Sequence, residues 1–273
     1  MGTIGDSPLG RATHYPEAYD AALLYAVERA PLRESLDIGS ALPFAGEDRW
    51  TVWELAWLDC MNRPRVGIVR FTVPATSPRI VESKSVKLYF ASLNHARFDD
   101  PRAVEAALRK DLSIAIGANV DVRVDTPEHW SRHARVDLGG ESIDGEIPAS
   151  LPREPHADAL RTLRARVDET LVYHGFRSVC PVTGQPDYAS VGITYRGAAI
   201  DRPALAAYLF GYRHHPGFHE HCVERMFVDV MRACAPDALS IEARFTRRGG
   251  VDISPIRATP TTTLPQSRAN VRQ

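Results

Sequence analysis

Hydrophobic and polar residues alternate in several stretches of the chain, and this pattern predicts strands. The stretches share β-branched and aromatic residues with full or partial alternation. They are Thr51–Leu58, Arg65–Val73, Asn119–Val124, Ser190–Arg196 and Leu239–Thr246. Their spread along the chain predicts sheet structure in both halves.

Apolar residues at helical spacing separate these strands. Pro101 begins an amphipathic segment that continues through Leu112, and Pro203 begins another through Phe210. Proline is favoured in the first turn of a helix, where its missing N–H costs nothing. We also predict helices over Tyr19–Ala30 and Cys222–Ala233, whereas Ser85–Leu93 is either helical or irregular.

The second half repeats the first in outline. Glycine and proline gather between about Leu138 and Pro155, which predicts a linker, and Arg161–Val172 is ambiguous but partly extended. When the segments on either side are compared, Tyr89 matches Tyr208, and Phe98 matches Phe218 within one residue. A repeat of roughly 120 residues predicts two related α+β modules rather than a solenoid of short units.

The composition of the 273 residues excludes several classes of protein. The net charge is −1, so no global field favours nucleic acid or an anionic membrane, and the apolar runs are too short to span a bilayer. The N-terminal residues lack the basic and apolar regions of a signal peptide. Four widely spaced cysteines, with no C-x-x-C pair, predict free thiols in a reduced, cytoplasmic setting.

Cys180 lies in a segment that excludes helix. Two prolines and a glycine follow it in Pro181–Pro186, and Asp187 comes seven positions after the thiol. A displayed thiol with a carboxylate nearby predicts covalent catalysis, with Asp187 as acid or proton relay. An incidental cysteine on a surface loop fits the same segment, so the residues alone leave both interpretations open.

A histidine-rich segment, His214–Arg225, contains many atoms able to bind a metal. Its spacing does not favour zinc, because H-E-x-x-H would need a histidine where Val223 stands, and Pro216-Gly217 separates His215 from His219. A helix start carrying His219 and Glu220 is the better interpretation, and those side chains either face a ligand or are merely solvated.

Two further segments are able to bind anions. Val81–Tyr89 places hydroxyls and alternating charges before an apolar run, and Thr246–Gly250 contains two arginines and two glycines. Free N–H groups at a helix start, arginine and glycine all suit phosphate, although each signal alone is weak. Neither G-x-G-x-x-G after a strand nor a P-loop occurs, so the sequence does not support a Rossmann domain.

Together these segments resemble the NADPH-dependent 7-cyano-7-deazaguanine reductases, the nitrile reductases of queuosine biosynthesis, in their long two-module form. The resemblance rests on four strings in the same order: Glu82–Tyr89, Cys180 with Gln185-Pro186-Asp187, Phe218–Arg225 and Arg247–Ile253. It covers nearly the whole chain.

The resemblance implies an α+β tunnelling fold. Two tandem modules would each carry an antiparallel sheet with helices on one face, and a homodimer would complete the barrel. The expected boundaries are an N-terminal module with an extension over 1–145, a linker over 146–160 and a C-terminal module over 161–273. We also expect 1–11 and 259–273 to be mobile or to depend on an interface.

The resemblance also implies roles for individual residues. Catalysis falls to Cys180 as nucleophile, Asp187 as proton donor and His219 as a helper in the second reduction. The substrate, a small 7-deazaguanine, would be bound by Val81, Glu82, Ser83, His219 and Glu220, and NADPH by Ser83, Lys84, Arg248 and Gly249. No metal, nucleic acid or membrane partner is expected.

Two alternatives remain at this point. One is a metal-dependent, cyclohydrolase-like enzyme for pterins or purines on the same fold. The other is a purine-binding protein without catalytic activity, although intact Cys180, Asp187, His219 and Glu82 argue against a decayed site.

Overall fold

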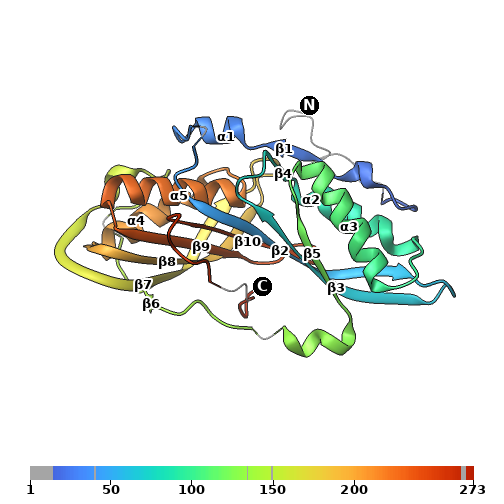
Figure 1. Ribbon diagram of the computed structural model, residues 1–273. Helices are drawn as coiled ribbons and strands as arrows, with labels where there is room; N and C mark the ends of the chain where they lie inside the picture. Colours follow the sequence, from blue (N-terminus) through green and yellow to red (C-terminus); the bar gives the residue numbers. More distant parts are fainter. Residues whose placement is uncertain (1–14, 40, 134, 149, 266–268) are drawn as a thin grey trace. The chain divides into compact units, whose positions relative to one another are not determined.

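The chain forms two compact units, each built from strands and helices, so the predicted α+β class is confirmed. The computed structural model describes residues 15–39, 41–133, 135–148, 150–265 and 269–273. Unit 1 comprises residues 1–32, 48–134 and 247–253, and unit 2 comprises 33–47, 135–246 and 254–273. The elements can be followed along the chain in Figure 1. The module boundaries expected from the sequence stay a prediction.

Unit 1 contains a sheet in the order β5-β3-β2, with β2 at Ala45–Leu58, β3 at Pro64–Pro74 and β5 at Asp121–Asp125. The part of β2 from Asp48 onward belongs to this unit, and β3 pairs antiparallel with β5. Two helices, α2 (Ser83–Ser92) and α3 (Pro101–Ile116), pack against the sheet. Their shared core includes Trp50, Val69, Phe71, Tyr89, Leu108 and Val122.

The helix ends of unit 1 follow from local side-chain chemistry. Glu82 caps α2, because its two carboxylate oxygens accept hydrogen bonds from the backbone N–H groups of Lys84 and Ser85. Asp100 caps α3 before Pro101, where one of its carboxylate oxygens accepts from the N–H of Ala103. The helix α2 resolves the segment that the sequence left as helical or irregular.

The predicted helix over Tyr19–Ala30 is wrong. Only Ala21–Leu23 forms a 3₁₀ turn, and β1 (Ala26–Glu28) pairs antiparallel with β4 (Arg79–Val81). A distant strand supplies the backbone partners here, so tertiary pairing overrides the local helical pattern. Strand β10 (Val251–Ala258) was not predicted, and Pro255 within it obscures the strand pattern.

Unit 2 contains three long antiparallel strands: β7 (Thr162–Val179), β8 (Pro186–Ile200) and β9 (Ala238–Phe245). The short β6 (Glu141–Ser142) pairs parallel to β7, and β10 joins β9 from Ser254 onward. Two helices, α4 (Arg202–Phe210) and α5 (His219–Cys234), complete the unit. The ambiguous segment Arg161–Val172 is therefore mostly strand.

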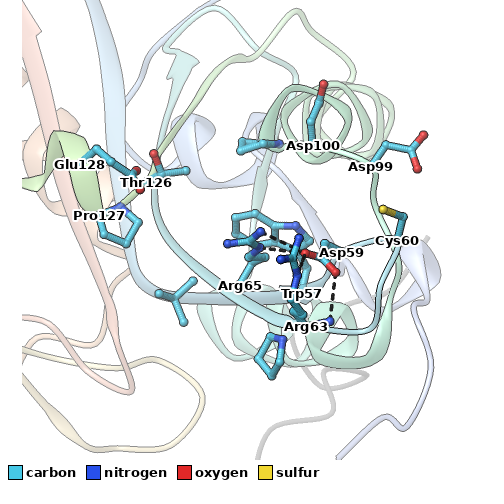
Figure 2. Close-up of a pocket in the computed structure, with 13 residues that line it drawn as sticks. Trp57, Asp59, Cys60, Arg63, Arg65, Asp99, Asp100, Thr126, Pro127 and Glu128 are labelled. Carbon is cyan, nitrogen blue, oxygen red and sulfur yellow. Dashed lines mark hydrogen bonds and ion pairs between the residues drawn. The ribbon is translucent and has the colours of Figure 1, made fainter.

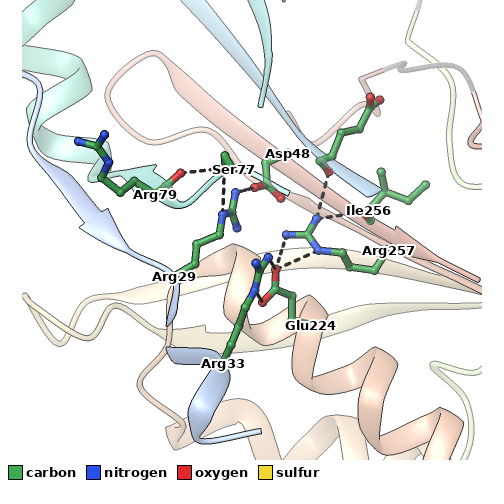
Figure 3. Close-up of polar contacts among 9 residues, drawn as sticks. Arg29, Arg33, Asp48, Ser77, Arg79, Glu224, Ile256 and Arg257 are labelled. Carbon is green, nitrogen blue, oxygen red and sulfur yellow. Dashed lines mark hydrogen bonds and ion pairs between the residues drawn. The ribbon is translucent and has the colours of Figure 1, made fainter. Parts of the chain in front are cut away.

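A buried charge cluster anchors α5 within unit 2, and it can be seen in Figure 3. Glu224 of α5 accepts hydrogen bonds from Arg33 (2.7 Å) and Arg257 (2.8 Å), and the Arg257 side chain is 0% exposed. Arg33 belongs to the short helix α1 (Ala30–Glu34). Both guanidinium groups also stack on the ring of Phe44. The cluster ties three separate chain segments to the helix.

The same tyrosine–aspartate pair joins the helices of each unit. In unit 1 the hydroxyl of Tyr89 on α2 donates to Asp111 of α3 at 2.8 Å. In unit 2 the hydroxyl of Tyr208 on α4 donates to Asp229 of α5 at 2.7 Å. Both α3 and α5 have 16 residues, and the aspartate holds the same place in each. This agreement supports the duplication inferred from Tyr89 and Tyr208.

No helix in the described part of the chain is long and apolar enough to cross a membrane. Of the two ends expected to be mobile, 1–11 lies outside the described residues. At the other end Asn270 and Gln273 are buried in unit 2, with exposed fractions of 2% and 1%, so for these residues the expectation is wrong.

Candidate active site

Cys180 lies in the tight turn that joins β7 to β8. Val179 and Pro186 form the last pair of the ladder. Inside the turn, the N–H of Cys180 donates to the carbonyl of Gln185 (2.9 Å), and the N–H of Gly184 donates to the carbonyl of Cys180 (3.0 Å). Gly184 has a φ of +69°, which glycine adopts without steric cost. The thiol is therefore half-buried on a closed turn rather than on a loose loop.

Asp187 begins β8 and is buried, with an exposed fraction of 4%. The β7–β8 register pairs it directly with Ser178. Residues opposite one another on antiparallel strands have neighbouring side chains on one face of the sheet, so Asp187 shares its face with Ser178. The carboxyl group therefore lies next to the strand end that leads into Cys180.

His219 contacts Asp187 because the loop before α5 is bonded to the end of β7. The N–H of Val179 donates to the carbonyl of His215 (3.1 Å), and the N–H of Gly217 donates to the carbonyl of Val179 (3.0 Å). His219 follows as the first residue of α5, and its Nε2 lies 3.4 Å from Oδ2 of Asp187. Residues separated in sequence thus gather around one hairpin turn.

The imidazole of His219 stacks on an aromatic ring. Its centroid lies 3.7 Å from that of Phe245 at the end of β9, and the two planes differ by 9°. The Nδ1 atom of His219 is buried and has no hydrogen-bond partner among the described residues. The next residue, Glu220, is 3% exposed in the first turn of α5.

The two buried thiols, Cys222 and Cys234, are held in their protonated form. Burial, followed by the charge of Asp187, raises the pKa of the Cys222 thiol to about 12. Burial alone raises the pKa of Cys234 to about 11. Both thiols therefore stay protonated at neutral pH and are poor nucleophiles, since the thiolate is the reactive form. Cys60 is exposed but lies in unit 1.

The predicted substrate and cofactor residues Val81–Lys84 lie at the start of α2 in unit 1. Val81 ends β4, Glu82 is the cap, and Ser83 and Lys84 begin the helix. The carboxylate of Glu82 is 3% exposed and already bonded to the backbone of its own helix. Any ligand bound by Glu82 would therefore share or replace those capping bonds.

Arg248 and Gly249 lie in a two-residue turn of unit 1. The N–H of Arg248 donates to the carbonyl of Val251 (2.9 Å). The central glycines have φ of +57° (Gly249) and +73° (Gly250), a conformation that disfavours other residues. A Cβ on Gly249 would lie 3.2 Å from Cδ of Lys87 on α2. The structure thus places this turn beside Lys87 of α2, three residues after Lys84.

Sequence reasoning missed several side chains near these positions. Lys87 belongs to the segment Glu82–Tyr89. It comes three residues after Lys84, a spacing that puts both lysines on one face of a helix, so the sequence could have indicated its place. Trp53 donates its backbone N–H to the carbonyl of Gly250, and Arg247 stacks on its ring at 5.0 Å. For Trp53 and for Phe245 in unit 2, the local pattern carries no such signal.

A cavity of about 420 Å³ in unit 1 lies at the β2–β3 turn and the start of α3 (Figure 2). Figure 2 shows Asp59 in its wall, where Oδ2 accepts from Nε of Arg63 at 2.8 Å and from Nε of Arg65 at 3.1 Å. Cys60 and Trp57 line it as well, but none of the predicted site residues does. The cavity therefore contributes nothing to the predicted chemistry.

The predicted site residues thus form two groups, one in each unit. Unit 2 holds the Cys180 turn, the contacting pair Asp187 and His219, and Glu220. Unit 1 holds the group Val81, Glu82, Ser83, Lys84, Arg248 and Gly249. Among the described residues, no three His, Cys, Asp or Glu side chains gather as metal ligands would. The roles of all these residues stay predictions.

Comparison with known proteins gives a consistent result. The family model described as "Nitrile reductase, 7-cyano-7-deazaguanine-reductase N-term" matches residues 15–124, and the one described as "QueF-like protein" matches 186–263. Proteins named NADPH-dependent 7-cyano-7-deazaguanine reductase from Burkholderia mallei (strain SAVP1), Burkholderia thailandensis and Burkholderia lata are each 46% identical over 269 residues. The match covers 98% of this chain and 98% of each relative.

Proposed function

The chain belongs to the family of NADPH-dependent 7-cyano-7-deazaguanine reductases, and we propose from this that it reduces the nitrile of 7-cyano-7-deazaguanine to a primary amine with two NADPH. The product would be 7-aminomethyl-7-deazaguanine, an intermediate of tRNA queuosine biosynthesis. The observation that carries the proposal, beyond the 46% identity, is the contact between Asp187 and His219 beside the half-buried Cys180 turn.

We propose that Cys180 is the nucleophile. A nitrile carbon accepts a soft thiolate readily, and attack by Sγ forms a C–S bond while one C≡N π bond breaks. The nitrogen takes a proton from Asp187, which gives a covalent thioimide. This step requires that Asp187 carries a proton, or shares one, when the thiol attacks. The other described thiols that are buried, Cys222 and Cys234, are held protonated and cannot replace Cys180.

We infer that His219 acts in the later proton transfers. After the first reduction the C–S bond breaks, and the thiolate of Cys180 leaves an imine. Its nitrogen needs further protons to become an amine, and His219 shares a 3.4 Å contact with the carboxyl of Asp187 through which protons can pass. The low exposure of this pair protects the imine from water, which would hydrolyse it.

NADPH, when bound, supplies the hydride for each of the two reductions. The residues present in unit 1 fit its phosphates: Ser83 and Lys84 offer a hydroxyl and a cation at the start of α2, where the N–H groups of Lys84 and Ser85 bind Glu82. Because Gly249 has no side chain, its backbone is accessible next to Lys87, in a space that a Cβ would fill. Arg248 adds a planar guanidinium, which suits phosphate oxygens. We therefore propose Ser83, Lys84, Arg248 and Gly249 as cofactor residues.

Recognition of the substrate is proposed for Val81, Glu82, Ser83, His219 and Glu220. A carboxylate matches the adjacent N–H donors of a guanine-like edge. Glu82 would exchange part of its capping bonds for such donors, and Glu220 is buried, at 3% exposure, beside the catalytic histidine. We further propose that each module has the tunnelling fold, that a homodimer completes the barrel, and that the enzyme works in the cytoplasm.

The test is turnover of 7-cyano-7-deazaguanine, followed by the loss of reduced-nicotinamide absorbance. We expect two NADPH per nitrile, and no turnover or a single equivalent would refute the proposal. Without NADPH, the wild type should gain the mass of the nitrile, and Cys180→Ala should not. Cys60→Ser is the matched control, since it removes an exposed thiol from unit 1 and should leave the adduct intact.

A further inference from the structure

The orientation of His219 has an unusual physical basis. A catalytic imidazole is normally held by hydrogen bonds at both nitrogens, and the bond at the second nitrogen sets its plane and tautomer. Here Nε2 faces Asp187 at 3.4 Å, whereas the buried Nδ1 has no hydrogen-bond partner among the described residues. Some other contact must therefore hold the plane of the ring.

Phe245 supplies that contact. Its ring lies 3.7 Å from the imidazole, centroid to centroid, with 9° between the planes. A parallel stack at this distance blocks tilting of the imidazole toward β9, and Phe245 itself is only 1% exposed. The phenyl face thus takes the place of the missing second hydrogen bond.

Phe245 is in turn fixed from two directions. Its ring meets Phe176 of β7 edge to face, at 6.0 Å and 86°, and Phe176 packs on Tyr212 at 5.3 Å. Its backbone carbonyl accepts a hydrogen bond from Nε2 of Gln273 (3.4 Å), and the same amide donates to Oγ of Ser254 (2.8 Å). A platform held on both its ring and its backbone cannot shift without disturbing β7 or β10.

Gln273 connects β9 to β10 at a point beyond the paired residues of their ladder. β9 and β10 pair through Ser240–Glu242 and Ile256–Ala258. Three residues further along β9, the buried Gln273 side chain bridges Phe245 to β10 instead. Asn270 steadies this side chain, because its N–H donates to Oε1 of Gln273 at 3.0 Å.

We propose that Phe245 is the positioning residue of His219, and that Gln273 holds Phe245 in place. The ring face keeps the imidazole opposite Asp187 through the proton transfers, so the loss in the rate of turnover should exceed any loss of substrate affinity through the proposed contact of His219 with the substrate. The inference rests on the proposed nitrile reduction, whose own test is turnover by the wild type.

Phe245→Leu keeps an apolar side chain but removes the flat ring. We expect kcat to fall by about 10- to 100-fold, since a misplaced catalytic group costs up to about 100-fold. KM for the nitrile should stay within about three-fold, and the covalent adduct on Cys180 should form to the same extent without NADPH. Phe227→Leu is the matched control, because Phe227 is a buried aromatic residue on α5 that packs on Phe44.

A spectroscopic readout separates positioning from general destabilisation. Protons above a phenyl face resonate upfield, so the His219 ring protons should move downfield in Phe245→Leu and stay unmoved in Phe227→Leu. Their signals are assigned by their loss in His219→Gln. A folded Phe245→Leu with wild-type kcat, an unmoved His219 signal, or an equal loss in Phe227→Leu would each overturn the proposal.

Gln273→Ala provides the second variant if Phe245→Leu does not fold. It alters no ring and lies outside the contacts of His219, so it should fold. We expect a smaller loss of kcat, about two- to ten-fold, with a His219 shift in the same direction. Wild-type kcat together with an unmoved signal in Gln273→Ala would refute the role of Gln273. If the wild type itself turns over no nitrile, the proposed function fails and not the positioning of the ring.

Discussion

The charge cluster beneath α5 gives the sharpest stability prediction. Glu224 lies 2.7 Å from Arg33 and 2.8 Å from Arg257, with side-chain exposures of 3%, 10% and 0%. In Glu224→Gln, the amide oxygen can still accept from one guanidinium, but the NH₂ group faces the other. Two buried cations then lose the negative charge that they share. Breaking a buried ion pair in this way costs about 3–5 kcal/mol.

The control is a surface pair on the same helix. Asp37→Asn removes an ion pair with Arg232 of α5 at 3.6 Å, where the two side chains are 85% and 57% exposed. Such pairs contribute about 1 kcal/mol or less, and asparagine tolerates the left-handed backbone of this position, where φ is +56°. Each variant removes one negative charge from an ion pair that involves α5, and the two pairs differ in how deeply they are buried. The comparison therefore tests the effect of burial on the free energy of unfolding.

Urea unfolding and hydrogen exchange measure the difference. We expect Glu224→Gln to lower the free energy of unfolding by about 3–5 kcal/mol and to speed exchange in peptides from α5, while peptides from α3 in unit 1 keep their protection. A loss below about 1 kcal/mol, or one equal to that of Asp37→Asn, would show that the cluster does not hold the helix.

Three further outcomes are expected. Burial raises the pKa of Asp252 from 3.8 to about 6, so the folded state keeps its proton longer and the free energy of unfolding should fall by up to about 3 kcal/mol as pH rises from about 4 to about 6. Asp252→Asn should flatten that dependence of stability on pH. The indole of Trp53 donates a hydrogen bond to Asp252, so its fluorescence should titrate near pH 6. A wild-type stability that does not change over this pH range would contradict the prediction. Gly249→Ala forces a φ of +57° on alanine, at a cost of about 1–2 kcal/mol. It should raise KM for NADPH about ten-fold and leave KM for the nitrile unchanged. An unchanged KM for NADPH would count against the proposed cofactor site. Iodoacetamide at about pH 8 should label Cys60 and spare Cys222, and Cys60→Ser should keep wild-type turnover; labelling of Cys222 would refute its burial.

Local patterns predicted most of the secondary structure, because the relevant forces act over short distances. The strands over Arg65–Val73 and Ser190–Arg196 and the helix from Pro101 all lie within longer observed elements of the same type. Proline and glycine after Cys180 likewise indicated a turn, and the observed turn is closed by backbone bonds. Failures occurred where a distant segment decides the conformation, as in β1, whose partner is β4.

The candidate site was predictable only in part, for a related reason. Each motif named a residue type suited to a role, but the contact between Asp187 and His219 depends on backbone bonds between Val179 and the loop before α5. Phe245 gives even less signal, since a phenylalanine in a strand ordinarily means core packing. Its stacking on His219 depends on how β9 and the start of α5 meet, which no local pattern encodes.

The duplication offers a physical reason for the proposal that only the β7–β8 hairpin is catalytic. At an offset of about 120 residues, Cys180 corresponds to Cys60 in the β2–β3 turn of unit 1. By the same offset Asp187 corresponds to Gly67, and by the helix starts His219 corresponds to Pro101. The counterpart positions therefore lack the carboxyl and the imidazole, and the carboxylate of Asp59, which adjoins Cys60, is already bound to Arg63 and Arg65. Addition of a thiol to a nitrile needs a proton donor, so we expect Cys60 to be catalytically silent.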